Sequence, residues 1–286
     1  MPDSAGGPTR LGGLAAISDR FDAAILDQWG VLHDGAKAPP GAVEAITAMT
    51  AAGKKMVVLS NSARFGSDSA SKLIALGYPE GTFKGVITSG ETTYDLLRDR
   101  NDPLFAGLGR KVLLIAREPT LINGLDYISV DVENADFVLL GSSTAPEKSL
   151  AADFAATLDR AAARGLPLIC ANPDRAGLAA TGLIEGPGYL AAYYEKIGGT
   201  VRYLGKPYPE VYGRAAALLG GISPERIIAI GDSLEHDIAG GRRFGCLTAF
   251  VEAGIHAADL AEPDGFSRLC GKYGATPDFV IPKLLW

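Results

Sequence analysis

The sequence has few cysteines, no long apolar run and no excess of basic residues, and each shortage excludes a class of protein. Its three cysteines, Cys170, Cys246 and Cys270, are far apart and odd in number. They therefore offer neither a disulfide framework nor paired zinc-ligand spacing, and a reducing cytoplasm is the expected location. Cys170 and Cys246 lie in apolar runs, where a cysteine most simply fills a core.

Hydropathy and charge exclude two further classes. No apolar run approaches the length of a membrane span, so no membrane association is expected. Residues 1–13 lack the basic-then-apolar pattern of a signal peptide, and we expect a loose leader there. The net charge of −6 argues against nucleic acid as a partner, because a phosphate backbone demands clustered lysine and arginine. A small anionic ligand remains compatible, since a metal ion can supply positive charge locally.

Strand-like and helix-like segments alternate from about residue 21 to the end of the chain. This alternation predicts an α/β fold with a mainly parallel sheet and helices on both faces. The middle of the chain repeats the pattern with enough strands and helices for an independent small domain. We therefore predict a core formed by residues 1–87 and 202–286, split by an inserted α/β cap domain at residues 88–201. The expected core strands are 23–26, 55–59, 85–87, 227–230 and 247–251, followed by a less regular tail; those of the cap are 111–115, 137–140 and 166–170.

Two of the expected core strands end on polar residues. The apolar run 23–26 delivers Asp27 to the carboxyl edge of the sheet, where α/β proteins bind ligands, and a glycine turn follows. The strand at 55–59 runs into Ser60 and Asn61. The Ser60 hydroxyl and nearby backbone N–H groups could donate to the oxygens of a phosphoryl group. The alternative is that Ser60 or Ser62 caps the next helix.

Two later segments add charged residues at the same kind of position. Lys206 lies in a Gly-Lys-Pro turn between a strand and a helix, where it could neutralise charge shared by a carboxylate and a phosphate; otherwise it is a solvated turn lysine. The strand at 227–230 runs into Gly231 and Asp232, and Asp237 follows five residues later. With Asp27, these carboxylates form the hard oxygen site that Mg²⁺ prefers. Alternatively, Asp232 is an N-cap and Asp237 lies on a solvated helix face.

In their order and strand-end placement, these segments resemble the four motifs of the haloacid dehalogenase (HAD) superfamily, over residues 21–251. The resemblance implies a HAD-like Rossmannoid core and a Mg²⁺-dependent phosphatase. Asp27 would be the nucleophile that forms an aspartyl-phosphate, which water then hydrolyses. Ser60 and Lys206 would steady the phosphoryl oxygens. The metal ligands would be the Asp27 side chain, the backbone carbonyl of Trp29 and Asp232, with Asp237 bracing the outer shell.

The inserted segment resembles subclass IIA of this superfamily, which includes sugar and nucleotide phosphatases. The supporting stretches are Thr88-Ser89-Gly90, Ala171-Asn172-Pro173-Asp174 and Gly186-Pro187-Gly188. In this subclass a cap covers the site and its Asn-Pro-Asp loop lies close to the substrate, although the tripeptide would form a turn in any case. We therefore predict that Asn172, Asp174 and Asn61 contact a small phosphorylated metabolite, together with Ser60 and Lys206. A homodimer is left open.

Trp29 departs from the family pattern. Most phosphatases of this superfamily have a second aspartate two residues after the nucleophile, which acts as general acid and base. Indole cannot exchange a proton at neutral pH. Three accounts are open. First, the protein could still hydrolyse phosphate esters, with His33 or Asp34 as the acid or with a leaving group that needs no proton. Second, the bond broken could be carbon–halogen or carbon–phosphorus, although dehalogenation uses no metal. Third, the protein could bind a phosphorylated ligand without turnover.

Overall fold

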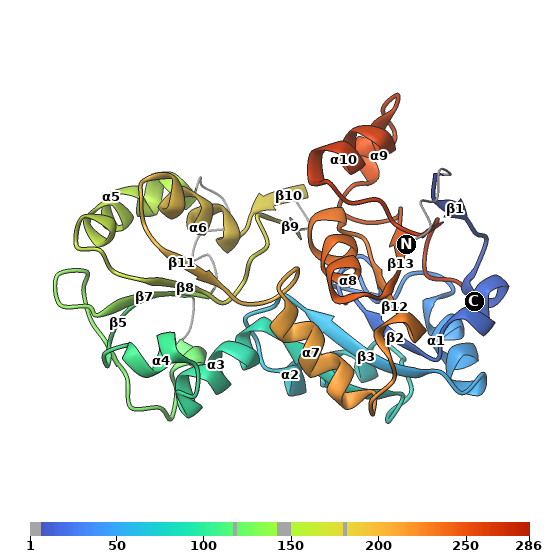
Figure 1. Cartoon of the computed structure of the whole chain (residues 1–286), viewed down its shortest axis with the longest axis horizontal. Helices are drawn as coiled ribbons and strands as arrows, with labels where there is room; N and C mark the ends of the chain where they lie inside the picture. The colour runs from blue at the N-terminus through green and yellow to red at the C-terminus, as the bar shows by residue number, and fades with distance from the viewer. Residues whose placement is uncertain (1–6, 117–118, 142–149, 180–181) are drawn as a thin grey trace. The chain divides into compact units, whose positions relative to one another are not determined.

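The structure, a computed structural model, describes residues 7–116, 119–141, 150–179 and 182–286. The chain forms two compact units (Figure 1). Unit 1 consists of Met1–Ser60, Gly66–Ile87 and Lys206–Trp286, and unit 2 of Asn61–Phe65 and Thr88–Gly205. Within the described segments, every helix is too short or too polar to cross a membrane.

Unit 1 is built on a seven-stranded sheet with the order β1-β14-β13-β12-β2-β3-β4. Strand β2 lies inside this sheet and pairs in parallel with β12 on one side and β3 on the other. Leu26, the last residue of β2, faces Ile230 of β12 and Val58 of β3. The carboxyl ends of the three strands therefore meet at one edge of the sheet. The strands are β1 (Thr9–Arg10), β2 (Ala23–Leu26), β3 (Lys55–Ser60), β4 (Phe83–Thr88), β12 (Ile227–Gly231), β13 (Leu247–Val251) and β14 (Phe279–Ile281).

Helices cover both faces of this sheet. In β2, Ala24 and Leu26 join a core cluster with side chains of α1, whereas Ala23 and Ile25 join a second cluster with side chains of α7. Because successive strand residues point to opposite faces, burial on both sides explains why β2 is a continuous apolar run. The helices of unit 1 are α1 (Ala42–Ala51), α2 (Gly66–Ala75), α7 (Pro209–Leu218), α8 (Ala239–Phe244), α9 (Ala257–Leu260) and α10 (Gly265–Tyr273), with 3-10 turns at Leu14–Arg20 and Pro224–Arg226 and a π-helical turn at Leu234–Ile238.

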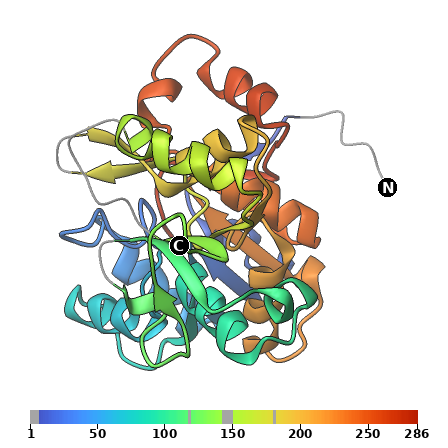
Figure 2. The same ribbon diagram turned by 90° about the vertical axis from the view of Figure 1, so that its left-hand side faces the viewer.

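Unit 2 contains a five-stranded sheet with the order β11-β8-β7-β5-β6, in which neighbouring strands run parallel. Helices α5 and α6 pack on one face and α3 and α4 on the other (Figures 1 and 2). Strands β9 and β10 form a separate antiparallel pair. The elements are α3 (Ser89–Asp99), α4 (Pro103–Gly107), β5 (Lys111–Ile115), a 3-10 turn (Pro119–Leu121), β6 (Ile128–Ser129), β7 (Phe137–Leu140), α5 (Leu150–Ala163), β8 (Leu168–Cys170), β9 (Ala176–Ala179), β10 (Gly182–Glu185), α6 (Pro187–Lys196) and β11 (Val201–Tyr203).

The α/β class with parallel sheets is as predicted, and β2, β5, β7 and β13 have the predicted bounds. The compact units differ from the expected domain boundaries in two places. Unit 2 includes Asn61–Phe65, which we expected in the core, and it extends to Gly205 rather than 201. The first difference has a local cause: the Thr88 hydroxyl donates to Arg64 O at 2.6 Å, which ties this segment to the start of α3.

Two predictions about the chain ends were wrong. Residues 9–10 of the expected loose leader form β1, which pairs with β14; Thr9 N donates to Asp278 O at 3.0 Å. Residues 1–6 of that leader lie outside the described residues. The tail after residue 251 is also more regular than expected, because it contains α9, α10 and β14. Strands β1 and β14 thus pair the two ends of the chain at one edge of the sheet.

Candidate active site

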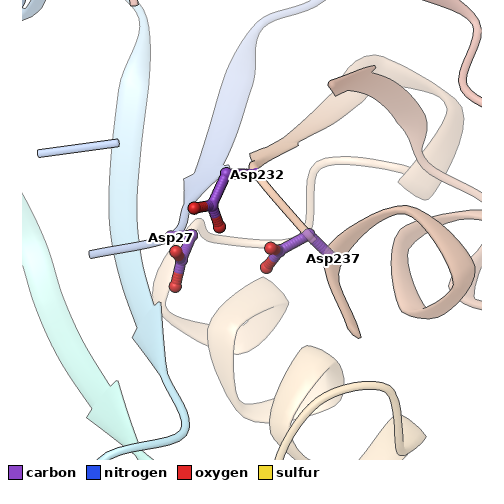
Figure 3. A group of neighbouring side chains, drawn as sticks. All are labelled: Asp27, Asp232 and Asp237. Atoms are coloured by element: carbon purple, nitrogen blue, oxygen red, sulfur yellow. The ribbon is translucent and has the colours of Figure 1, made fainter. Parts of the chain in front are cut away.

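Three carboxylates converge at the carboxyl edge of the seven-stranded sheet (Figure 3). Asp27 follows β2, Asp232 follows β12, and Asp237 lies in the π-helical turn after β12. One oxygen from each lies within 4.8 Å of the others, and the residues are 8%, 5% and 4% exposed, respectively. Buried like charges at this separation repel, so the group requires positive charge nearby. The alternative of a solvated Asp237 is therefore wrong.

Glycines allow the backbone to approach these carboxylates. Gly30, three residues after Asp27, has a φ of +79°, and a Cβ there would overlap the Asp232 carboxylate. A Cβ on Gly231 would overlap Asp237 in the same way. Only glycine satisfies the positive φ and the close approach together at position 30. The glycine turn after β2 thus belongs to the construction of the site.

Lys206 supplies one positive charge inside the carboxylate group. Its side chain is 5% exposed, and its ammonium donates hydrogen bonds to Asp27 Oδ1 and, at 2.7 Å, to Asp237 Oδ1. Lys206 is therefore a buried member of the site, and the alternative of a solvated turn lysine is wrong. Three carboxylates against one ammonium leave a formal excess of two negative charges when all are ionised.

The raised pKa values of Asp27 and Asp232 reflect this excess of negative charge. Burial raises the pKa of Asp27 to about 7; Lys206 opposes the rise and Asp237 adds to it. Burial also raises the pKa of Asp232 well above its ordinary value, with the charges of Asp27 and Asp237 as further causes. A divalent cation would remove the excess and favour the ionised forms of both groups.

The donor set fits a hard divalent cation. Each of three carboxylates offers oxygen, the element that Mg²⁺ prefers. The Asp27 carboxylate accepts a hydrogen bond from Lys206 at Oδ1 and one from the Gln28 N–H, and Asp232 accepts the Ile255 N–H through Oδ2 at 2.8 Å. Asp237 uses both oxygens already, Oδ1 for Lys206 and Oδ2 for the Ser233 N–H at 3.1 Å. This arrangement suits Asp27 and Asp232 as direct ligands and Asp237 as a residue that orients others.

The other predicted residues fall into two groups. Ser60 ends β3 beside β2 in unit 1 and is 3% exposed; because α2 begins only at Gly66, Ser60 is not its N-cap. Asn61, Asn172 and Asp174 all belong to unit 2. Asn61 Nδ2 donates to Asp174 Oδ1 at 2.8 Å, and Asn172 Oδ1 accepts the Asp174 N–H at 3.0 Å. The structure therefore assembles Asp27, Lys206, Asp232 and Asp237 in one cluster, and the Asn-Pro-Asp loop with Asn61 in another.

Trp29 lies in a tight turn directly after Asp27. The Leu32 N–H donates to Gln28 O at 2.9 Å, and the Gly30 N–H donates to His33 O at 2.9 Å. The indole is 40% exposed and packs edge-on against the His33 ring at a centroid distance of 4.9 Å. Lys72 Nζ lies 5.2 Å from the indole centroid, within cation–π distance. Lys72 was missed by the sequence analysis, because a lysine on an amphipathic helix carries no motif.

His33 and Asp34, the candidate substitutes for a missing acid, have structural roles instead. His33 is fully buried, and its Nδ1 accepts the Gly35 N–H at 3.0 Å. Burial lowers the pKa of His33 to about 4, with Lys72 as a further cause, so the imidazole is neutral at physiological pH. Asp34 Oδ1 accepts the N–H groups of Ala36 and Lys37, both at 2.9 Å, which lowers its pKa. Neither side chain is a proton donor at neutral pH.

The His33 environment predicts an acid-sensitive fold. The unfolded chain protonates His33 below a pKa of 6.5, whereas the folded chain resists protonation down to about 4. Stability from this group is therefore complete above pH 6.5 and is lost as the pH falls toward 4, by about 3 kcal/mol. Urea unfolding of the wild type and His33→Gln at pH 7 and pH 4.5 measures it. The variant should lose less free energy of unfolding on acidification; an equal loss would contradict the prediction.

The sequence is similar to those of known hydrolases. The sequence matches the family described as haloacid dehalogenase-like hydrolase over residues 24–125, and the one described as HAD-hydrolase-like over 203–285. It is 28% identical over 251 residues to a D-glycerol 3-phosphate phosphatase of Mycobacterium tuberculosis, covering 86% of this chain and 67% of that protein. It is 25% identical over 233 residues to a dihydroxyacetone phosphatase of Corynebacterium glutamicum, covering 81% of each.

Structural comparison leads to the same family. A hydrolase of the haloacid dehalogenase-like family from Brucella suis superposes with a TM-score of 0.81 at 30% identity, covering 97% of this chain and all of that one. At 30% identity over nearly the whole of both chains, the match shows a common family as well as a shared fold. The chain therefore belongs to the haloacid dehalogenase-like hydrolases, and within them to the subclass IIA that its inserted segment indicated.

Proposed function

We propose that this protein is a Mg²⁺-dependent phosphatase that hydrolyses the phosphoric monoester of a small sugar or polyol through an aspartyl-phosphate on Asp27. The observation that carries the proposal is the buried cluster of Asp27, Asp232 and Asp237 around Lys206. The relatives support the substrate class, because two of them are named as phosphatases of three-carbon compounds. An inserted cap of this subclass would exclude large substrates such as phosphoproteins.

Asp27 is the nucleophile in this proposal. Its carboxylate would attack phosphorus in line with the leaving oxygen, forming the acyl phosphate that water later cleaves. Lys206 donates a hydrogen bond to Asp27 Oδ1, so its ammonium lies beside the carboxylate that would attack. The same ammonium would neutralise the phosphoryl oxygens as they approach the carboxylate. Ser60, at the end of the adjacent strand, would donate its hydroxyl to another of those oxygens.

The metal would be held by Asp27, Asp232 and the backbone carbonyl of Trp29, with Asp237 orienting Lys206 and the turn at Ser233. When bound, a divalent cation neutralises the charge shared by the aspartates and the transferring phosphoryl group. Asp232 is held for this task by the Ile255 N–H. Through its hydrogen bond to the Lys206 ammonium, Asp237 would keep that ammonium close to Asp27.

Trp29 supports a second candidate function. An exposed indole two residues after the nucleophile cannot protonate a leaving group, and His33 is neutral and buried. A protein that binds a phosphorylated ligand with little turnover would tolerate this. Retention of Asp27, Lys206 and the acidic pair favours the enzyme, since a pure binder has no use for a nucleophile. Dehalogenation, which needs no metal, does not account for the acidic pair.

The test is phosphate release from a panel of phosphorylated sugars, polyols and nucleotides, with and without Mg²⁺. Metal-dependent release that Asp27→Asn abolishes would support the phosphatase, and the ranking of substrates would identify its class. If no compound of the panel releases phosphate but the same compounds bind in a Mg²⁺-dependent way in calorimetry, the binding protein is favoured. Gel filtration of the same preparation would test the homodimer, which stays a prediction.

Metal removal gives an independent prediction. Chelation with EDTA should abolish turnover, and Mg²⁺ should restore it. Because the cation relieves repulsion among three buried carboxylates, Mg²⁺ at about 100 times its Kd should add about 2.7 kcal/mol to the free energy of unfolding. Thermal unfolding measures this gain in the wild type, in Asp232→Asn and in Asp68→Asn, an exposed control on α2. The gain should disappear in Asp232→Asn alone; its persistence there would place the metal elsewhere.

A further inference from the structure

The segment Asn61–Phe65, the strap, connects two pieces of unit 1 in sequence but belongs to unit 2. Its backbone is fixed there by hydrogen bonds. Ser62 O accepts the Gly90 N–H at 3.0 Å and the Ser89 hydroxyl at 3.1 Å. The same Ser89 hydroxyl lies 2.6 Å from Ala171 O, at the start of the Asn-Pro-Asp loop. The strap and this loop are therefore held against the first turn of α3 together.

Asn61 is the first residue of the strap, and both its amide nitrogen and its amide oxygen lie in close contact with neighbouring residues. The side chain is 3% exposed, and Nδ2 donates to Asp174 Oδ1 at 2.8 Å. On the other side, a Cβ on Gly205 would lie 2.5 Å from Asn61 Oδ1 and 2.9 Å from Pro173 Cδ. Gly205 also has a φ of +124°, so glycine is required there for conformation and for space. Asn61, Asp174 and Gly205 thus form one tightly packed cluster.

This cluster sits next in sequence to two residues of the proposed reaction. Asn61 is bonded to Ser60, and Gly205 is bonded to Lys206. Within unit 1, Ser60 ends β3 beside the nucleophile strand, and Lys206 hydrogen-bonds Asp27. Ser60 is therefore the last residue of one piece of unit 1, and Lys206 is the first residue of another. Each is one peptide bond away from the cluster.

We propose that Asn61 and Asp174 are positioning residues that fix Ser60 and Lys206 through the backbone, rather than contacts for the substrate. The proposal rests on the proposed function, which assigns the phosphoryl group to Ser60 and Lys206. The Asn61–Asp174 hydrogen bond joins the strap to the Asn-Pro-Asp loop, and the packing on Gly205 joins both to the chain that leads into Lys206. Loss of the Asn61–Asp174 hydrogen bond should therefore displace Ser60 and Lys206. A displacement of 1 Å at a reacting group lowers a rate by about 10²-fold.

An exchange of the two side chains tests the pair. Asn61→Asp alone puts two carboxylates at hydrogen-bond distance, where they repel. The double variant Asn61→Asp/Asp174→Asn restores a carboxylate–amide bond in the reverse direction. With p-nitrophenyl phosphate and Mg²⁺, the single variant should lose about 10-fold or more in kcat, with KM changed far less, and the double variant should regain most of the loss. Asn101→Asp, at an exposed loop position of unit 2, is the matched control and should match the wild type.

The outcomes separate this inference from the proposed function. A double variant no more active than Asn61→Asp alone, or a loss confined to KM, would overturn the positioning role and favour direct substrate contact. If the wild type itself releases no phosphate, the proposed function fails. The pair is then judged by orthovanadate affinity, measured by thermal shift with Mg²⁺. There the single variant should bind more weakly and the double variant should recover, and failure to recover would again reject the pair. Unfolding temperatures without ligand identify any variant that fails to fold.

Discussion

Replacing Asp27 with asparagine is expected to reduce phosphate release from every substrate by at least about 10⁴-fold while leaving the fold intact. An amide has the shape of the carboxylate but cannot attack phosphorus. Its oxygen can still accept the hydrogen bond from Lys206. Removal of one of three buried like charges also relieves repulsion with Asp232 and Asp237, so the variant without metal should unfold at the same temperature as the wild type or higher.

The measurement combines phosphate release, circular dichroism and thermal unfolding for the wild type, Asp27→Asn and Asp68→Asn. The last is a matched control, because Asp68 is an exposed carboxylate on α2 of the same unit. Mass spectrometry of acid-quenched wild type should detect a phosphoryl group on Asp27 during turnover. Full activity in a folded Asp27→Asn protein would reject the covalent mechanism. Loss of both activity and structure would show instead that Asp27 serves the fold.

The core of the site could be predicted because its chemistry is tied to strand ends. Strand β2 is buried on both faces, so its apolar run is continuous and Asp27 marks where it stops. The same holds for β12 before Asp232. In parallel sheets the carboxyl ends of neighbouring strands meet at one edge, and a local pattern therefore carries information about distant contacts. Lys206 could be assigned to the same site because it lies in a turn that follows a strand.

Contacts that depend on distant polar partners could not be predicted in this way. Nothing in the sequence near Asn61 indicates that its amide bonds Asp174, 113 residues away, or that the strap belongs to unit 2. Strand β1 is only two residues long and pairs with β14 near the opposite end of the chain, so neither strand shows a period. The neutral, buried state of His33 likewise follows from the packing of the turn after Asp27 rather than from residue type.

Trp29→Asp is expected to raise the rate on alkyl phosphates by a factor on the order of 10²–10⁴, the contribution of a general acid and base. An alkoxide is a poor leaving group and gains most from protonation, whereas p-nitrophenolate leaves without a proton. The increase should therefore be large for glycerol phosphate and small for p-nitrophenyl phosphate. The backbone carbonyl of residue 29 is unchanged, so the proposed metal ligand is retained. The tight turn that holds it depends on backbone hydrogen bonds rather than on the indole.

Trp29→Asn separates proton transfer from shape, because asparagine matches aspartate in size but has no proton to exchange. Both variants remove the indole from His33 and Lys72 and open the surface beside the nucleophile. If only the aspartate variant accelerates alkyl phosphates, the wild-type enzyme is limited by a missing acid. If both variants accelerate equally, the indole limits access instead. If both are slower than the wild type, Trp29 helps to form the substrate pocket, and the identity of this residue is a requirement of the reaction.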